Sequence, residues 1–254
     1  MGIVISCHIP KGGNFKTTTV QACGEILSKD YGKRILCIDT DSQASLSLVS
    51  GIDTEAQKDN LYTLLNHECS IKDCIVSTKY YDLIPGALKL STADSVLHEI
   101  GKENFLKEHI DQIRDDYDYI FIDTPPSLNL MNVMSATAAD EMLITCEASY
   151  MSMSAIDQLY KTVQSVKKYL NPNLHMLGIL IVRYNPRANI NKSIVEAISK
   201  QAAAMKIHVF DVGIRETVKI REAQAQTIPL TEWANDCTAM CDYQDFIREV
   251  LKFI

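Results

Sequence analysis

Residues 10–18 constrain the fold of this chain more than any other segment. They read Pro-Lys-Gly-Gly-Asn-Phe-Lys-Thr-Thr and lie between a short apolar run, residues 3–7, and a segment of helical periodicity, residues 17–30. A strand, a glycine-bearing loop and a helix N-terminus in this order present consecutive backbone N–H groups to an anion. Lys16 adds a full positive charge, and the Thr17 hydroxyl is a ligand type that suits Mg²⁺. The segment therefore predicts a phosphate-binding loop.

Phe15 departs from the phosphate-loop pattern, which has a glycine directly before the lysine. Glycine there permits positive φ and a close approach of backbone to phosphate. A left-handed residue other than glycine costs about 1–2 kcal/mol. Asn14 tolerates that conformation better than most residues, so we expect Asn14 to adopt it and the Phe15 ring to swing outward. Two hypotheses stay open: nucleotide still binds and is hydrolysed, or Phe15 leaves nucleotide handling weak or lost.

Size and composition describe an ordinary globular chain. It has 254 residues, of which 46% are hydrophobic and 22% charged, and no repeat or Gly/Ser linker divides it, so we expect one domain over residues 1–254. The net charge of −7 gives no overall attraction to nucleic acid, so any DNA contact needs a local basic patch. No apolar run approaches the roughly 20 residues of a membrane span, and the chain begins without a basic leader.

The cysteines are scattered and do not form a recognisable metal motif. Cys237 and Cys241 are spaced closely, but no second Cys/His pair accompanies them. We therefore expect reduced thiols and a cytoplasmic protein. The eight cysteines are Cys7, Cys23, Cys37, Cys69, Cys74, Cys146, Cys237 and Cys241.

Apolar runs alternate with segments of helical periodicity, which predicts an α/β fold with a mostly parallel sheet covered by helices on both faces. The expected strands are residues 3–7, 34–39, 81–84, 119–123, 142–146, 176–182 and 207–210. The expected helices lie near residues 17–30, 58–66, 91–98, 102–115, 128–138, 153–170, 190–204, 217–225 and 240–253.

Acidic residues follow two of these strands at the ends where ligands bind in open α/β sheets. The second strand runs into Asp39-Thr-Asp41-Ser-Gln43, and the fourth into Asp123-Thr-Pro-Pro-Ser127. A single aspartate at a strand end is often structural. Several such ends beside a phosphate loop predict a nucleotide site.

These motifs together resemble the ParA/Soj branch of the deviant-Walker-A ATPases, relatives of MinD, and the resemblance covers essentially the whole chain. The family pattern K-G-G-x-G-K-T-T is met at Lys11, Gly12, Gly13, Lys16, Thr17 and Thr18, and missed at Phe15. The D-x-D-x-Q element is met at Asp39, Asp41 and Gln43, with Ser42 in place of the usual proline. The D-x-P-P-S segment is met in full by residues 123–127. The resemblance implies a P-loop NTPase-like fold.

The resemblance also implies a mechanism, with ATP and Mg²⁺ as cofactors. Two subunits would sandwich two ATP molecules, with Lys16 on its own nucleotide and Lys11 reaching the partner's, although Lys11 can also be read as a solvated loop lysine. Asp41 would orient the attacking water. Thr17, Asp39 and Asp123 would surround Mg²⁺, the two aspartates through waters. The nucleotide-binding residues would be Lys11, Gly12, Gly13, Asn14, Phe15, Lys16, Thr17 and Thr18.

The C-terminal third concentrates basic residues that can neutralise phosphates without reading bases. In the resembled family such regions hold non-specific DNA, and a centromere-binding ParB-like partner stimulates hydrolysis. An ordinary solvated helix face is the alternative for each residue. The residues are Arg183, Arg187, Lys192, Arg215, Lys219 and Arg221. The resemblance thus implies a cytoplasmic homodimer that associates with the nucleoid when ATP is bound and takes part in plasmid, mobile-element or chromosome partition.

Two other functions stay open at this point. One is a non-hydrolysing scaffold or regulator of the same fold, impaired by Phe15. The other is a MinD-like membrane-surface switch, because residues 242–254 are amphipathic at helical spacing. The acidic residues Asp242, Asp245 and Glu249 favour instead a terminal helix that packs Phe246 and its apolar neighbours on the core.

Overall fold

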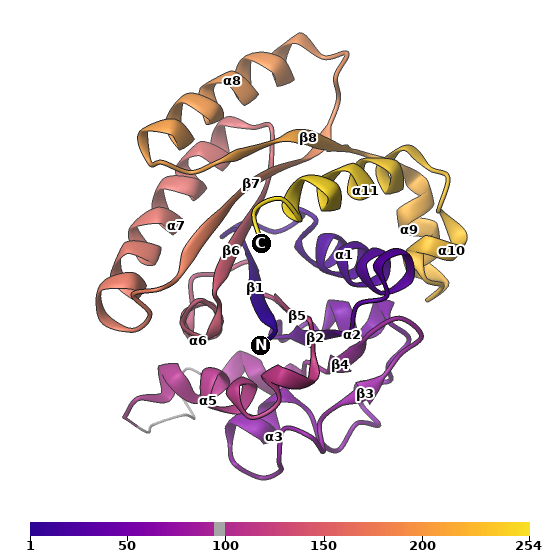
Figure 1. Cartoon of the computed structure of the whole chain (residues 1–254), viewed down its shortest axis with the longest axis vertical. Helices are drawn as coiled ribbons and strands as arrows, with labels where there is room; N and C mark the ends of the chain where they lie inside the picture. Colours follow the sequence, from indigo (N-terminus) through magenta and orange to yellow (C-terminus); the bar gives the residue numbers. More distant parts are fainter. Residues whose placement is uncertain (94–99) are drawn as a thin grey trace.

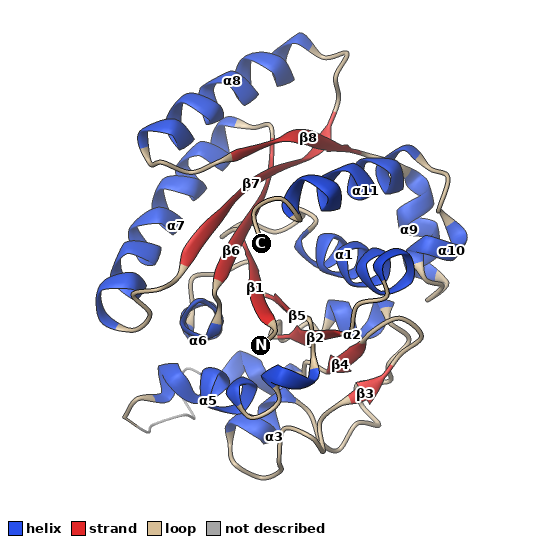
Figure 2. Ribbon diagram, viewed as in Figure 1, coloured by secondary structure: helices blue, strands red, loops and turns tan. Residues whose placement is uncertain are grey.

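The computed structural model describes residues 1–93 and 100–254, and its centre is one eight-stranded sheet (Figure 2). The strands are ordered β3-β4-β2-β5-β1-β6-β7-β8, and neighbours are parallel except for β3 and β4. Their bounds are β1 Ile3–His8, β2 Ile35–Asp39, β3 Val76–Ser77, β4 Asp82–Ile84, β5 Tyr119–Asp123, β6 Glu141–Glu147, β7 His175–Tyr184 and β8 Val209–Arg215.

Helices cover both faces of the sheet (Figure 1). One face carries α3 Leu61–Leu65, α5 Phe105–Asp111, α6 Leu130–Ala138, α7 Tyr150–Tyr169 and α8 Asn189–Ala204. The other carries α1 Lys16–Tyr31, α2 Ser45–Val49, α9 Val218–Ala225, α10 Leu230–Trp233 and α11 Thr238–Val250. Short 3₁₀ turns lie at Leu88–Thr92, Lys102–Asn104 and Arg114–Asp116.

Side chains of each strand point alternately to the two faces of the sheet, and they form one hydrophobic core on each face. In β2, Leu36 and Ile38 join the core under α3 and α6, whereas Ile35 and Cys37 join the core under α1 and α11. Successive side chains of a strand point to opposite faces, and both faces here are covered, so all five residues of β2 are buried. The continuous apolar runs of the sequence are explained by this double burial.

The predicted α/β, P-loop NTPase-like fold with helices on both faces is confirmed. Three short elements were not predicted from the sequence: β3, α2 and α10, none longer than five residues. The last strand, expected at 207–210, is Val209–Arg215, because it is an edge strand whose half-exposed residues need not be apolar. The helix expected at 91–98 lies largely outside the described residues. A single domain over 1–254 stays a prediction.

The C-terminal helix packs on the sheet as the sequence favoured. Tyr243, Phe246, Ile247 and Val250 of α11 are at most 5% exposed and belong to the core that α1 also covers. The Tyr243 hydroxyl lies 3.0 Å from the Thr19 hydroxyl of α1. The apolar face that a membrane anchor would need is therefore occupied by the protein itself. Among the described residues, no helix combines the length and apolar character that crossing a bilayer requires.

Candidate nucleotide site

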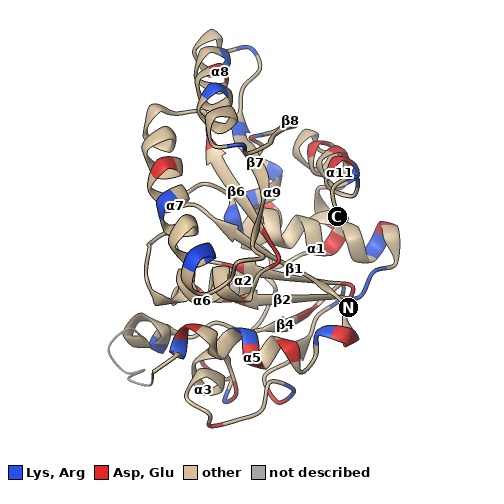
Figure 3. Cartoon of the chain, turned by 60° about the vertical axis from the view of Figure 1, so that its left-hand side comes forward, with Lys and Arg blue, Asp and Glu red and all other residues tan. Residues whose placement is uncertain are grey.

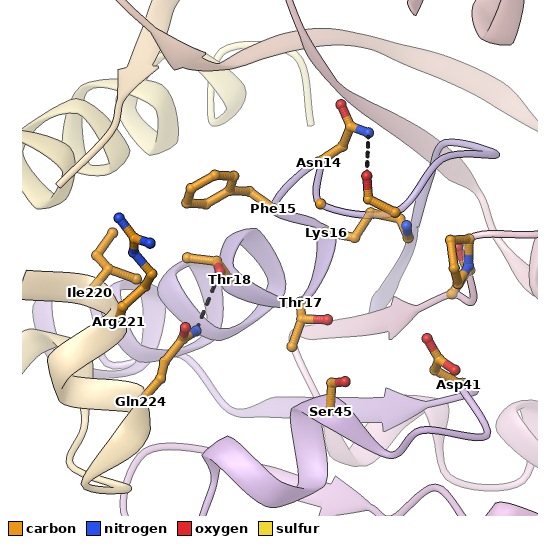
Figure 4. A pocket seen from close by; sticks show the side chains of 14 residues that line it. Asn14, Phe15, Lys16, Thr17, Thr18, Asp41, Ser45, Ile220, Arg221 and Gln224 are labelled. Carbon is orange, nitrogen blue, oxygen red and sulfur yellow. Dashed lines mark hydrogen bonds between the residues drawn. The ribbon is translucent and has the colours of Figure 1, made fainter. Parts of the chain in front are cut away.

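Parallel pairing brings three loops to one edge of the sheet. In register, Cys7 of β1 lies opposite Asp123 of β5, and Asp123 lies opposite Asp39 of β2. The loop after β1 therefore meets the ends of β2 and β5 over a cavity of about 300 Å³ (Figure 4). Its lining residues are Gly12, Gly13, Asn14, Phe15, Lys16, Thr17, Thr18, Asp41, Ser45, Thr124, Pro126, Ile220, Arg221 and Gln224.

The loop conformation corrects one prediction. Phe15, and not Asn14, is the left-handed residue before α1, with φ 55° and ψ 23°. The buried Asn14 side chain links the loop to the end of β6. Its amide NH₂ donates to the carbonyl oxygens of Lys11 and Gly12 at 3.2 Å each, and its Oδ1 accepts from the N–H of Glu147 at 2.9 Å. Because these bonds fix Asn14, the irregular conformation falls on the next residue.

The Phe15 ring does swing outward, as expected. In Figure 4 it points away from Lys16, Thr17 and Asp41 and toward the side of the cavity formed by Ile220 and Arg221 of α9. The half-buried ring packs against the core under α1 and α11. A Cβ built on Gly12 or Gly13 would meet nothing within 4 Å. The concave side of the loop is therefore open for a ligand despite the aromatic side chain.

Lys16 is a buried cation without a carboxylate partner among the described residues. It is 7% exposed, and its Nζ lies 3.5 Å from the carbonyl oxygens of Ile9 and Lys11. Neutral carbonyls at this distance are weak partners for a full charge. The positive charge of Lys16 is therefore available to pair with a bound anion. The backbone N–H groups of the loop favour a phosphate as that anion.

Thr17 and Asp123 form the part of the site that fits a metal ion. The Thr17 hydroxyl donates to Asp123 Oδ2 at 2.6 Å, whereas Oδ1 is buried with no hydrogen-bond partner among the described residues. Burial, and next the charge of Asp39, raises the pKa of Asp123 to about 8. A buried acceptor without a donor is costly. A hydrated Mg²⁺ would supply both the missing donor and the positive charge, so these residues fit Mg²⁺.

The Asp39 carboxylate accepts three hydrogen bonds from residues close to it in the sequence. Its Oδ2 accepts from the N–H and the hydroxyl of Ser47 at 2.8 Å each, and its Oδ1 accepts from the N–H of Asp41 at 3.2 Å. Burial raises its pKa to about 6. Asp39 thus positions the segment that carries Asp41. Its predicted water-mediated role at Mg²⁺ stays a prediction.

Asp41 is the acidic side chain that reaches the cavity. It is half-buried, its Oδ1 accepts from the N–H of Gln43 at 2.9 Å, and Figure 4 shows it across from Thr17. Gly86, after β4, packs against this segment so closely that a Cβ would lie 2.8 Å from the Asp41 carbonyl oxygen. Glycine is required there, and this contact holds the Asp41 loop against the sheet.

A row of alternating charges borders the loop on the side of β6 to β8. Lys11 Nζ lies 3.7 Å from Glu147, and Arg183 donates to Glu147 at 2.7 Å. Arg183 also contacts Glu216 at 3.3 Å, and Glu216 contacts Arg221 at 3.6 Å. Lys11 therefore lies at the rim and is neutralised within its own subunit, whereas Lys16 is buried and forms no ion pair within residues 1–93 and 100–254.

The predicted basic residues divide into two groups. Arg183, Arg215, Lys219 and Arg221 each contact a carboxylate, with Arg215 on Asp242 at 2.6 Å and Lys219 on Asp236 at 3.5 Å. Arg187 and Lys192 are exposed, and no carboxylate of the described residues lies within ion-pair distance of them. In Figure 3 the ribbon is blue at Lys and Arg and red at Asp and Glu, and both colours appear on α8 and on neighbouring elements.

Several residues of the site were not predicted from the sequence. Gln224 of α9 donates to the Thr18 hydroxyl at 3.3 Å (Figure 4), and Ile220 lines the cavity beside it. Ser47 and Glu147 hold Asp39 and Lys11. None carries a local motif. Their roles depend on contacts between residues as far as 206 positions apart.

Comparisons with known proteins identify the family of this chain. The protein-family profile described as "AAA domain" matches residues 2–176. The chain is 30% identical to the sporulation initiation inhibitor protein Soj of Bacillus subtilis strain 168, with 98% of each chain covered. It is also 30% identical to the chromosome partitioning protein ParA of Caulobacter vibrioides, over 98% of this chain and 94% of that one.

Solved structures show the same fold. A putative plasmid partition protein from Borrelia burgdorferi bound to AMPPNP superposes with a TM-score of 0.84 at 23% identity, with 100% of each chain covered. Cobyrinic acid a,c-diamide synthase from Mycobacterium smegmatis, with bound ATP analog and magnesium, superposes with a TM-score of 0.89 at 24% identity, over 99% of this chain and 95% of that one. At such identities the likeness concerns the fold alone.

Proposed function

The chain belongs to the ParA/Soj-type group of the MinD/ParA ATPase superfamily, and we propose that it is an ATP hydrolase that works as a nucleotide-switched dimer in DNA partition. The observation that carries this proposal is that Lys16, Thr17 and Asp41 line one cavity at the sheet edge, with the buried Asp123 hydrogen-bonded to Thr17 beneath it. A cation, a hydroxyl and carboxylates in that arrangement are what phosphoryl transfer to water needs.

Each residue has a distinct part in the proposed reaction. Lys16 and the N–H groups of the loop would bind the β- and γ-phosphates, and Thr17 with Asp123 would hold the hydrated metal ion. Mg²⁺, when bound, neutralises charge on the phosphates. Asp41 accepts a hydrogen bond from the attacking water and orients it. These groups are preorganised by the hydrogen bonds of Asn14 and Asp39 and by the close packing of Gly86.

The proposed dimer gives Lys11 its function. Lys11 is at the rim, 28% exposed, and its partner Glu147 also contacts Arg183. Because Arg183 can retain Glu147, Lys11 can leave this pair at modest cost and reach a phosphate of the partner subunit's ATP. Pairing between partly exposed groups is worth about 1 kcal/mol or less.

The first experiment tests nucleotide binding and turnover. Wild type and Lys16→Ala are titrated with labelled ATP and Mg²⁺, and phosphate release is measured, with Lys58→Ala as a control for loss of a surface lysine. We expect saturable binding and turnover in wild type and the control, and a loss of about 10²–10³-fold in Lys16→Ala. Absence of saturable binding at millimolar ATP in wild type would overturn the proposal.

A second candidate function is a scaffold that binds ATP without hydrolysing it. The observation that favours it is the left-handed Phe15, a strained residue directly before Lys16 in the loop. The same titration separates the two, because the scaffold would bind ATP with saturation and release no phosphate above background.

Non-specific DNA binding is proposed for the side of the molecule that carries Arg187 and Lys192, which lack carboxylate partners in the described part of the chain. Replacing both by alanine should weaken binding to random-sequence DNA in ATP and reduce the slope of log K against log salt by about two. The matched control replaces Lys58 and Lys72, near α3 at the opposite end of the molecule (Figure 1). Equal retention of both double variants on a DNA column would contradict this role.

We also propose a partner protein of the ParB type, and this proposal rests only on membership of the family.

A further inference from the structure

Two cysteines outside the nucleotide site lie face to face. Cys69 and Cys74 are in the loop between α3 and β3, and their Sγ atoms are 3.1 Å apart. A disulfide bond is about 2.05 Å long, so a small rotation of the two side chains would bring the sulfurs to bonding distance.

The loop is folded so that this proximity is built in. Ser70 donates to Asp73 Oδ2 through both its N–H, at 3.0 Å, and its hydroxyl, at 2.6 Å. Between them Ile71 is 2% exposed and anchors the loop in the core. The backbone turn therefore holds the two cysteines together independently of their own contact.

The two thiols differ in access. Cys69 is half-buried, and its thiol donates to the Thr63 hydroxyl at 3.4 Å. Cys74 is fully buried, and its thiol lies 3.5 Å from the Asn60 carbonyl oxygen. One reachable thiol beside a protected one is the arrangement in which the first is modified and the second resolves the adduct.

We propose that Cys69 and Cys74 form a dithiol site that small, uncharged disulfides oxidise to an intrachain disulfide. In the first step the Cys69 sulfur loses its proton and attacks the oxidant, RSSR, giving Cys69–S–SR and one RSH. In the second step the Cys74 sulfur loses its proton and attacks Cys69 Sγ, the S–SR bond breaks, and a second RSH leaves. The two thiols are oxidised by two electrons, and RSSR is reduced to two RSH.

The groups around Cys74 predict which of the two thiols reacts first and which kind of oxidant it reacts with. Burial raises the pKa of the Cys74 thiol, and the neighbouring Cys69, Asp59 and Asp73 raise it further. The thiolate is the nucleophile, so Cys74 is a poor partner for an external oxidant and reacts only within the pair. The same acidic residues disfavour anionic oxidants.

Oxidation should leave the surrounding fold in place. Asn60 and Thr63 cap α3 reciprocally: Asn60 Oδ1 accepts from the N–H of Thr63 at 3.3 Å, and the Thr63 hydroxyl faces the N–H of Asn60 at 2.9 Å. These bonds do not involve the sulfurs. The disulfide would replace two weak thiol donors only.

The test uses the full chain with 2-hydroxyethyl disulfide as the oxidant, alkylation of remaining thiols, and mass spectrometry after trypsin. Cleavage after Lys58, Lys72 and Lys79 separates the two cysteines, so a disulfide joins peptide 59–72 to peptide 73–79. We expect this linked pair, and its loss on reduction with dithiothreitol. The exposed Cys241 serves as an internal control for reaction with the oxidant.

Two single variants test the order of events, with circular dichroism to check folding. Cys74→Ser should stop at the mixed disulfide on Cys69, and Cys69→Ser should leave Cys74 unmodified. The proposal is overturned if Cys241 is fully modified while no 59–72 to 73–79 link forms in wild type. This wild-type measurement decides the matter even where a variant fails to fold.

Discussion

The two sides of the nucleotide cavity hold their charges in opposite ways. On the side of β2 and β5, Asp39 and Asp123 are buried, and no basic side chain of the described residues forms an ion pair with either. On the side of β6 to β8, the cations Lys11, Arg183 and Arg221 are exposed or half-exposed, and each contacts a glutamate. The buried carboxylates have no ion-pair partner in the part of the chain that the structure describes, whereas the rim is already neutralised by its own residues.

This difference indicates separate duties. Buried groups with raised pKa values are typical of functional sites, because their unfavourable state is maintained for a ligand. Exposed ion pairs contribute little to stability and exchange partners readily. We therefore expect changes on the buried side to alter chemistry and stability strongly, and changes on the rim to alter association with little effect on the fold.

The largest effect is expected at Asp41. Asp41→Asn keeps the size of the side chain and removes the charge that would orient water, so ATP hydrolysis should fall by about 10²–10⁴-fold while ATP binding is retained. Phosphate release and equilibrium binding are measured on the same samples. Asp211→Asn, an exposed carboxylate of β8, is the control. A loss of binding parallel to the loss of turnover would show that Asp41 acts on affinity instead.

The next largest effect concerns how the free energy of unfolding depends on pH, measured in EDTA so that no divalent metal ion is bound. The pKa of Asp123 is raised to about 8 and that of Asp39 to about 6. Between about pH 4 and these values the folded state keeps protons that the unfolded state has released, so their contribution to the free energy of unfolding is full below about pH 4 and is lost as pH rises to about 8.

Asp123→Asn removes the larger part of this effect. Its melting temperature should exceed that of wild type at about pH 8 by several degrees, at about 2–4 °C per kcal/mol, and the difference should shrink toward about pH 5. Asn still offers an oxygen to the Thr17 hydroxyl. Parallel melting curves for the two proteins across this range would mean that Asp123 is not the group that loses its proton.

A smaller effect is expected at Phe15. Phe15→Gly relieves about 1–2 kcal/mol of left-handed strain but removes the ring's packing beside α9. Because the ring points away from Lys16, Thr17 and Asp41, KM for ATP should change by less than about tenfold. Steady-state kinetics with Phe15→Leu as the matched strained variant measure this. A recovery of turnover by several orders of magnitude in Phe15→Gly alone would favour the scaffold with an impaired loop.

The smallest effect on stability is expected at the rim. Glu216→Gln leaves Arg221 without its partner and weakens the hold on Arg183, yet the free energy of unfolding should change by less than about 1 kcal/mol. The freed cations should strengthen retention on random-sequence DNA at low salt. Chemical denaturation and a DNA column measure the two quantities, and a marked loss of stability would contradict the division between the two sides.

The sequence by itself determined the sheet, the phosphate loop and the acidic strand ends, because these depend on local periodicity and on residue types within a few positions. Lys16, Thr17, Asp41 and Asp123 could be chosen this way; the first three line one cavity, and Asp123 is hydrogen-bonded to Thr17. Short elements such as β3 and α10 escaped prediction because a few residues carry too little periodicity.

Only the tertiary structure decided which charges are free. Lys11 and Lys16 belong to the same loop and look alike in sequence, but Glu147, at the end of a strand that begins at residue 141, neutralises the first. A long-range contact also explains why Phe15 is the left-handed residue, because the N–H of Glu147, at the end of that strand, holds the Asn14 side chain. Long-range contacts set burial and pairing, and burial and pairing set what a charged side chain can do.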